Sequence, residues 1–220
     1  MQTQTVDTQS TSQTLEESQF SLIEIVKEEY TKGLLALNSI GAYSVTFYGG
    51  SKVKSEDKAY QDVKKLAEMF AKKGWGVTSG GGPGIMEAAL KGAQNGGGKA
   101  IALRINIKDE PSTLKPDVDI SFTQFSVRKY VLRQSDVFVF APGGLGTLDE
   151  LMEVLTLTKT HKFPQKPIFL YDSEFWKGYL KWFKEILLKD RGVVDESFLD
   201  MFTVVDSPEE VMEKMGLLGC

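Results

Sequence analysis

An apolar run, a glycine-rich turn and a helical pattern follow one another in the second half of this chain. Residues 136–140 (DVFVF) have the composition of a buried strand, residues 142–146 (PGGLG) form the turn, and apolar residues at helical spacing begin at Leu151. A short apolar run of this kind is typical of a parallel strand covered on both faces. The stretch therefore predicts an α/β fold in which helices follow strands.

The same alternation extends over most of the chain. Strand-like runs occur at residues 43–48, 75–78, 99–103, 120–122, 166–171 and 202–205, and helical patterns occur at residues 55–73, 83–95, 126–134, 174–189 and from 207 onward. Strands that alternate with helices predict a parallel sheet joined by right-handed crossovers. We therefore expect residues 15–220 to form a single Rossmann-like domain, a doubly wound sheet with helices on both faces.

The N-terminal segment precedes this alternation. Residues 1–14 are rich in Gln, Thr and Ser, and this composition predicts a disordered tail. In residues 15–38, steps of three and four separate the apolar residues, which indicates an extra amphipathic helix: Phe20, Ile23, Val26, Tyr30, Leu34 and Leu37. We expect this helix to pack on the outside of the domain or on a partner subunit.

Composition excludes several classes of function. The formal net charge of −4 disfavours a nucleic-acid partner, and no apolar run is long enough to span a membrane. The single cysteine, Cys220, and the single histidine, His161, provide neither a disulfide nor a set of metal ligands. We expect a cytoplasmic protein that contacts neither membrane nor nucleic acid and needs no metal.

Three glycine turns follow predicted strands, at residues 49–51, 80–84 and 142–146. The carboxyl ends of parallel strands share one edge of the sheet, where ligands bind in folds of this class. Glycine permits close approach of a ligand to the backbone, and a helix that starts after such a turn directs unpaired N–H groups outward. The turns therefore predict a site for a nucleotide or a sugar phosphate.

Neither of two common phosphate motifs is present. A Walker A loop requires G-x-x-x-x-G-K-[ST], and the dinucleotide pattern requires G-x-G-x-x-G after the first strand, where the sequence is GGSKV. An ATPase and a dehydrogenase are therefore disfavoured. A structural alternative also applies to the central turn, because Thr147 and Glu150 have the spacing of a capping box.

Four sequence features together resemble the Lonely Guy (LOG) family, formerly labelled lysine decarboxylase-like. They are GGGPGIM at residues 80–86, PGGLGTLDE at residues 142–150, the Gly50-Ser51 turn and the Arg128-Lys129 pair. The resemblance covers roughly residues 43–215. It implies a phosphoribohydrolase, which cleaves the N-glycosidic bond of a nucleoside 5′-monophosphate, such as AMP or an N6-substituted AMP, to free base and ribose 5-phosphate. Decarboxylation would require a lysine-bound pyridoxal phosphate, for which the sequence shows no setting.

The resemblance also implies roles for individual residues. Glu150 is the candidate carboxylate that stabilises positive charge on the ribose and orients water. Arg128 would clamp the phosphate or hold Glu150 in place, although it could also be a surface arginine, with Arg133 nearer the site. The remaining substrate-binding candidates are Gly50, Ser51, Gly81, Gly82, Met86, Glu110, Lys129, Gly143, Gly144, Gly146, Thr147 and Thr156. Met86 could equally belong to the core, and no cofactor is implied.

The resemblance leaves two questions open. Family members form homodimers, and the apolar segment at residues 151–157 could serve that interface or pack within one chain. The related molybdenum-cofactor carrier proteins share similar glycine turns, so a non-catalytic nucleotide-binding or cofactor-carrying protein is the alternative. An acid beside the anion site favours the enzyme.

Overall fold

Seven parallel strands form one sheet in the order β4-β3-β2-β1-β5-β6-β7. The computed structural model describes residues 8–105 and 114–218. The strands are β1 (Ser44–Tyr48), β2 (Gly76–Ser79), β3 (Ala100–Ile105), β4 (Val118–Phe122), β5 (Val137–Phe140), β6 (Ile168–Tyr171) and β7 (Thr203–Val205). The predicted α/β fold with a doubly wound parallel sheet is confirmed.

The strand order reverses next to β1. The chain runs outward from β1 to β4, then returns to place β5 on the other side of β1, with Phe47 opposite Val139 and Tyr48 opposite Phe140. In open parallel sheets the crevice at such a reversal is the usual ligand site. The carboxyl ends of β1 and β5 therefore mark the place where a site is expected.

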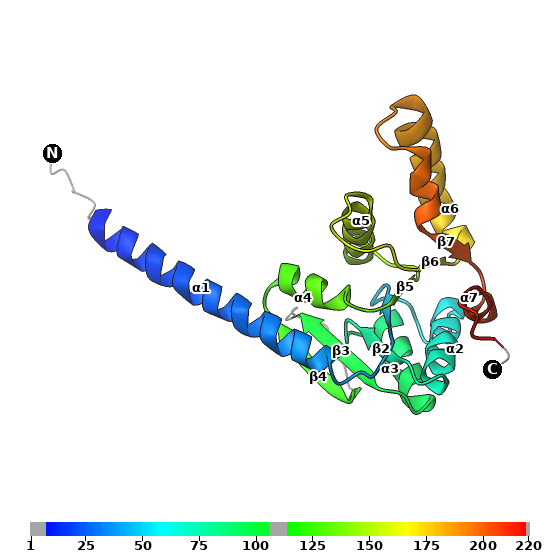
Figure 1. The fold of residues 1–220 in the computed structure, drawn as a ribbon, viewed down its shortest axis with the longest axis horizontal. Helices are drawn as coiled ribbons and strands as arrows, with labels where there is room; N and C mark the ends of the chain where they lie inside the picture. Colours follow the sequence, from blue (N-terminus) through cyan, green and yellow to red (C-terminus); the bar gives the residue numbers. More distant parts are fainter. Residues whose placement is uncertain (1–7, 106–113, 219–220) are drawn as a thin grey trace.

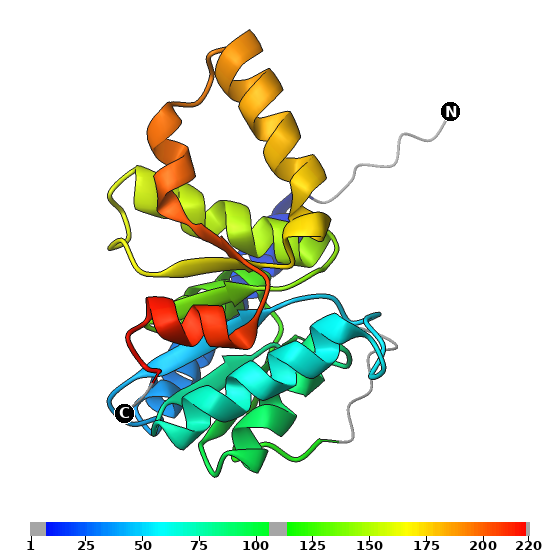
Figure 2. The same ribbon diagram turned by 90° about the vertical axis from the view of Figure 1, so that its right-hand side faces the viewer.

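Helices cover both faces of the sheet (Figures 1 and 2). Residues of α2, α3 and α7 share one buried cluster, and those of α4, α5 and α6 share the cluster on the opposite face. The helices are α1 (Thr8–Leu37), α2 (Lys58–Lys72), α3 (Ile85–Asn95), α4 (Phe125–Leu132), α5 (Leu145–Lys159), α6 (Ser173–Trp182), η1 (Phe183–Asp190), η2 (Glu196–Met201) and α7 (Pro208–Lys214).

Strand β5 shows how the sequence fills both layers. Val137 and Val139 point into the cluster beneath α2 and α3, whereas Phe138 and Phe140 point into the cluster beneath α4 and α5. Successive side chains of a strand face opposite sides of a sheet. All four residues are buried, which explains the uninterrupted apolar run in the sequence.

The N-terminal helix is longer than predicted. α1 begins at Thr8, so residues 8–14 of the predicted disordered tail are helical, and residues 1–7 lie outside the described residues. Nothing in residues 8–14 is Gly or Pro, and an established helix extends readily through polar residues of this kind. The C-terminal half of α1 packs on α4 and β4, and the N-terminal half extends away from the sheet (Figure 1).

The predicted helix at residues 174–189 has two parts. An α-helix ends at Trp182 and continues as the π-helical η1, whose Phe183 stacks on Phe198 of η2 with ring centroids 3.7 Å apart. The wider helical repeat changes the direction of the side chains that follow. The short 3₁₀ helix η2 was not anticipated from the sequence.

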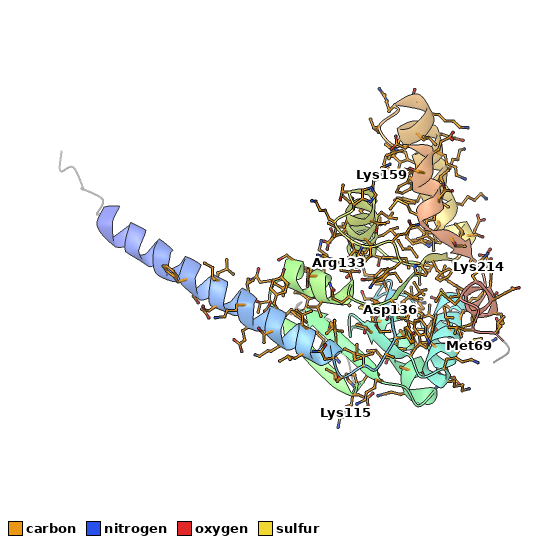
Figure 3. All side chains as sticks on the ribbon, viewed as in Figure 1. Met69, Lys115, Arg133, Asp136, Lys159 and Lys214 are labelled. Atoms are coloured by element: carbon orange, nitrogen blue, oxygen red, sulfur yellow. The ribbon has the colours of Figure 1, made fainter. Side chains whose placement is uncertain are left out.

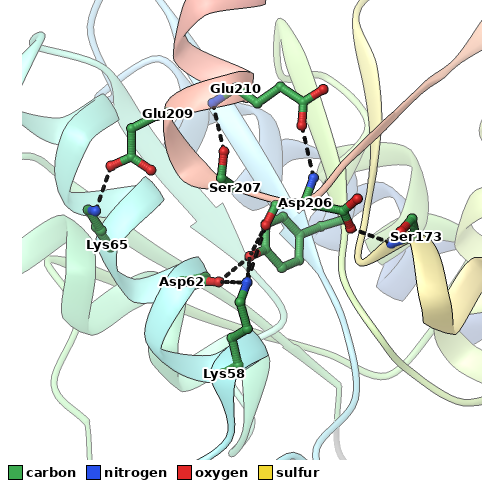
Figure 4. A network of polar contacts seen from close by, with 9 residues as sticks. Lys58, Asp62, Lys65, Ser173, Asp206, Ser207, Glu209 and Glu210 are labelled. Atoms are coloured by element: carbon green, nitrogen blue, oxygen red, sulfur yellow. Dashed lines mark hydrogen bonds and ion pairs between the residues drawn. The ribbon is translucent and has the colours of Figure 1, made fainter.

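A polar network joins the ends of β6 and β7 to α2 and α7 (Figure 4). Tyr171 at the end of β6 donates to Asp62 of α2, and Lys58 lies 2.5 Å from the same carboxylate. At the start of α7, the Ser207 hydroxyl accepts from the backbone N–H of Glu210, and Pro208 takes the first helical position, as the sequence predicts. None of the helices in the described part of the chain combines the length and apolarity needed to cross a bilayer.

Candidate functional site

The three glycine turns interlock at the carboxyl edge of the sheet. The backbone N–H of Gly50 donates to the Pro142 carbonyl over 2.9 Å, and the backbone N–H of Ile85 donates to the Gly50 carbonyl over 3.1 Å. The turn after β1 is thus hydrogen-bonded to the turns after β5 and β2. This arrangement confirms that the glycine motifs of the sequence gather at one edge.

Close backbone approach explains two of the glycines. A Cβ atom at Gly84, whose φ is +67°, would lie 2.3 Å from the Gly50 carbonyl oxygen. A Cβ atom at Gly143 would lie 2.1 Å from the hydroxyl oxygen of Thr147. A side chain at Gly84 would collide with the backbone of the turn after β1, and one at Gly143 would collide with the Thr147 side chain and come within 3.0 Å of the Gly50 backbone nitrogen.

A pocket of about 390 Å³ opens between these turns. Its size lies within the range of small-molecule sites. Most of the lining comes from the ends of β1, β2, β3 and β5 and from the first turns of α4 and α5: Gly49, Gly50, Ser51, Gly80, Gly82, Met86, Arg104, Ile105, Phe125, Arg128, Gly144, Leu145, Gly146, Thr147 and Glu150.

The N-terminus of α5 forms one wall of the pocket. The helix begins at Leu145 with Gly144 as its N-cap, so Thr147 is not an N-cap residue and the capping-box alternative is wrong. The N–H groups of the first turn have no partner within the helix. They combine with the positive end of the helix dipole to give an anion-binding wall.

Arg128 and Glu150 form a buried ion pair in the same pocket. The Arg128 Nη1 donates to the Glu150 Oε1 over 3.1 Å, and the side chains are 8% and 14% exposed. The Arg128 Nε also donates to the Leu103 carbonyl over 2.6 Å. Arg128 is therefore held at two points, and its remaining guanidinium N–H groups can meet a ligand.

Burial governs the ionisation of Glu150. Removal from water raises the pKa of its carboxyl group to about 7, and the positive charge of Arg128 opposes this rise. A carboxyl group with this pKa is about half ionised at neutral pH. The pocket thus holds a carboxylate suited to proton transfer and charge stabilisation beside an anion-binding wall.

Two further basic residues, Lys129 of α4 and Arg133 directly after this helix, are absent from the pocket lining. Arg133, labelled near α4 in Figure 3, pairs with Glu153 of α5 and lies over the ring of Tyr130, with the guanidinium carbon 4.6 Å from the centroid. Lys129 lies 3.0 Å from Asp149 and 2.7 Å from Glu153. Of the two arginines considered from the sequence, Arg128 is the one that lines the pocket.

The structure places the predicted binding residues differently with respect to the pocket. Gly50, Ser51, Gly82, Met86, Gly144, Gly146 and Thr147 line the pocket. Gly81 and Gly143 belong to its turns without lining it, and Lys129 pairs with acids of α5. Thr156 is exposed on α5 and is absent from the pocket lining, because it lies more than a helical turn beyond Glu150. Glu110 lies outside the described residues.

Arg104 and Phe125 were not anticipated. Arg104, at the end of β3, donates from Nε to Asp119 over 2.7 Å and from Nη1 to the Gly81 carbonyl. Phe125, the first residue of α4, is 53% exposed at the pocket. A charged residue at the carboxyl end of an otherwise apolar strand was the available signal for Arg104.

The family model described as "Possible lysine decarboxylase" matches residues 86–215, more than half of the chain. The matched segment includes α4, the central glycine turn and α5, and so contains both members of the buried ion pair. The chain belongs to this family. It is the family formerly labelled lysine decarboxylase-like, to which the LOG resemblance pointed.

Curated relatives in the LOG family carry a different activity in their names. The chain is 28% identical over 210 residues to the rice (Oryza sativa subsp. japonica) protein named "Probable cytokinin riboside 5′-monophosphate phosphoribohydrolase", covering 87% of this chain and 78% of the relative. It is also 28% identical over 155 residues to the Mycobacterium tuberculosis cytokinin riboside 5′-monophosphate phosphoribohydrolase, covering 67% and 80%.

Solved structures of lower sequence identity share this fold. The molybdenum cofactor binding protein from Rippkaea orientalis superimposes with a TM-score of 0.61 at 22% identity, over 81% of this chain and 98% of that one. This similarity concerns the fold alone. None of the described residues that line the pocket is a lysine, the residue to which pyridoxal phosphate is bound in decarboxylases.

Proposed function

We propose that this protein is a phosphoribohydrolase that cleaves the N-glycosidic bond of a nucleoside 5′-monophosphate, releasing the free base and ribose 5-phosphate. The observation that carries the proposal is the buried Arg128–Glu150 pair in the same pocket as the anion-binding start of α5. The names of the curated relatives support the same reaction class. AMP and N6-substituted AMP are the first substrates to test.

In the proposed complex, the 5′-phosphate lies against the first turn of α5. The N–H groups of Gly146 and Thr147 and the positive end of the helix dipole bind its oxygens. The guanidinium of Arg128 adds a charged donor from the other side of the pocket. This arrangement fixes one end of the substrate and directs the ribose toward Glu150.

Glu150 performs the charge stabilisation in the proposed reaction. As the bond between ribose and base breaks, positive charge develops on the sugar, as in glycoside hydrolysis. The ionised carboxylate, whose side chain is only 14% exposed, faces that charge, and its burial strengthens the electrostatic stabilisation. The electron pair of the broken bond leaves with the base nitrogen, which takes a proton from solvent, and the carboxylate accepts a proton from the water whose oxygen bonds to the ribose carbon.

A non-catalytic carrier protein would have little need of the Arg128–Glu150 pair. A protein that only binds a phosphate-bearing ligand needs the anion-binding wall, but it gains nothing from a carboxylate directed into the same pocket. Holding Glu150 out of water disfavours its charged form, as its raised pKa indicates. A group maintained at that cost is typical of a catalytic site.

We propose that the enzyme acts as a homodimer, as the family resemblance implies, and in the cytoplasm, as the composition of the chain indicates. Light scattering on purified protein tests the dimer by measuring its molecular mass in solution.

The activity itself is tested by incubating the protein with AMP, GMP, CMP, UMP and an N6-substituted AMP and separating the products by chromatography. Free base and ribose 5-phosphate in equal amounts support the proposal. Nucleotide binding without release of any base would favour the carrier.

A further inference from the structure

Glu29 is a buried acid on α1, outside the pocket and outside the segment matched by the family model. It is 8% exposed, and both of its carboxylate oxygens accept hydrogen bonds. Oε1 accepts from the backbone N–H of Thr123 over 2.6 Å and from the Thr123 hydroxyl over 2.7 Å, and Oε2 accepts from the backbone N–H of Gln124 over 3.2 Å. A buried carboxylate with three donors is a specific contact.

These donors lie at the start of α4. Gln124 is the N-cap residue of that helix, and its own side chain does not cap it. Glu29 of α1, 95 residues away in sequence, instead accepts from the backbone N–H of this N-cap residue. A negative charge at this end of a helix is favourable because it faces the positive end of the helix dipole.

The first turn of α4 carries Arg128. The backbone N–H of Arg128 donates to the Gln124 carbonyl over 3.1 Å, which is the first hydrogen bond of the helix. α4 has only eight residues, so contacts at its start strongly affect its position. A continuous set of contacts thus leads from Glu29 through Gln124 and Arg128 to Glu150.

Docking of α1 does not depend on the Glu29 carboxylate alone. Gly33 packs so closely on Val131 that an added Cβ atom would lie 2.6 Å from its side chain. Tyr30 and Tyr130 form an edge-to-face pair with centroids 5.1 Å apart. The interface between α1 and α4 therefore already has apolar contacts, and the Glu29 carboxylate additionally holds the start of α4.

We propose that Glu29 is a positioning residue, which sets the start of α4 and thereby holds Arg128 in register with Glu150. This inference rests on the proposed phosphoribohydrolase function. It assigns the N-terminal helix a role in the reaction although no described residue of that helix lines the pocket. Misplacement of a catalytic group by about 1 Å is enough to lower a rate by about 100-fold.

The test compares Glu29→Gln with Glu28→Gln. Glu28 is adjacent on α1, is 63% exposed and pairs only with Lys32 among the described residues, so its loss is a matched control for the charge change. We expect Glu29→Gln to lower kcat about tenfold or more and to move the acid limb of the kcat/KM profile to higher pH, because a displaced Arg128 no longer favours ionised Glu150. Glu28→Gln should change neither.

A second measurement does not depend on activity. The Nε–H signal of Arg128, identified by its absence in Arg128→Lys, reports the hydrogen bond to the Leu103 carbonyl in ¹⁵N NMR spectra. We expect Glu29→Gln to shift this signal or speed its exchange with solvent. If Glu29→Gln does not fold, Thr123→Val removes one of the three hydrogen bonds and should give a smaller change in the same direction.

The outcomes separate the two proposals. If the wild type releases no base from any nucleotide, the proposed function fails, and the Arg128 signal still tests the role of Glu29. If Glu29→Gln, or Thr123→Val in its place, leaves kcat, the acid limb and the Arg128 signal as in Glu28→Gln, the positioning role is overturned. A fall in thermal stability alone would contradict the proposal in the same way.

Discussion

The Arg128 guanidinium reaches the Glu150 carboxylate over 3.1 Å, although the two residues lie on different helices and both are largely buried. The pair joins α4 to α5 directly at the pocket. In the proposed reaction its two members have separate tasks: Glu150 would face developing positive charge, and Arg128 would face the anion while it limits the rise in the Glu150 pKa. Changes at either residue should therefore have different, separable effects.

The activity should depend on pH through Glu150. The proposed reaction needs the ionised carboxylate, and burial raises its pKa to about 7. We predict that kcat/KM rises about tenfold per pH unit below that value and levels off above it. Initial rates between pH 5.5 and 9 measure this profile. A profile that is flat below pH 7 would show that the carboxylate is not required in its ionised form.

Replacing Arg128 with methionine should lower stability in a pH-dependent manner. In the wild type the folded-state pKa of Glu150 is about 7, above the ordinary value, so its contribution to stability falls as pH rises toward 7 and then stays level. Without the guanidinium that pKa rises further, so the stability of Arg128→Met continues to fall above pH 7.

We expect a loss of about 3 kcal/mol in the free energy of unfolding at pH 8, the size typical of a broken buried pair, and a smaller loss at pH 5. Urea denaturation at both pH values measures it. Arg133→Met is the control, because its pair with Glu153 lies outside the pocket. Equal losses at both pH values would contradict the assigned electrostatics.

Gly146→Ala should separate stability from binding. A Cβ atom there meets nothing within 4 Å, so alanine fits and should stabilise the helix by about 0.5–1 kcal/mol. The same methyl group would occupy the space where the phosphate is proposed to lie, and we predict a rise in KM of about tenfold.

Gly178→Ala in α6 is the matched control, since a Cβ atom there also meets nothing within 4 Å and the position is outside the pocket lining. Steady-state kinetics and thermal melting are measured on both variants. If Gly146→Ala binds the nucleotide as well as Gly178→Ala does, the phosphate lies elsewhere.

Arg104→Ala should weaken substrate binding through the glycine turn after β2. Arg104 donates to the Gly81 carbonyl and so ties the turn after β2 to the end of β3. We predict a rise in KM of about threefold to tenfold with a smaller change in kcat. Arg191→Ala, an exposed arginine, is the control. A fall in kcat with unchanged KM would place Arg104 in a different role.

Local patterns in the sequence predicted much of the fold and of the pocket. The apolar run before the central turn predicted β5, and the glycines at residues 80–84 and 142–146 predicted the edge where the pocket lies, because turn chemistry is encoded by neighbouring residues. The start of α1 was misplaced by seven residues, since polar residues without Gly or Pro allow a helix to continue.

Sequence patterns alone could not predict contacts between segments that are distant in the chain. The choice between Arg128 and Arg133 depends on the rotation of a short helix, which packs on β3 and α1. Nothing around Glu29 in the sequence indicates that its carboxylate accepts from amides 94 and 95 residues away. Thr156 shows the converse error, because helical spacing from Glu150 does not place a residue in the pocket.

Base release by the wild type, Glu150→Gln and Asp149→Asn tests the central claim most directly. Asp149 is the adjacent acid of α5, is 58% exposed and pairs with Lys129, so its variant controls for the change in charge. We predict free base and ribose 5-phosphate from the wild type and Asp149→Asn, and a rate at least 100-fold lower from Glu150→Gln with nucleotide binding retained. Equal rates from all three proteins, or binding without base release by the wild type, would contradict the proposed phosphoribohydrolase.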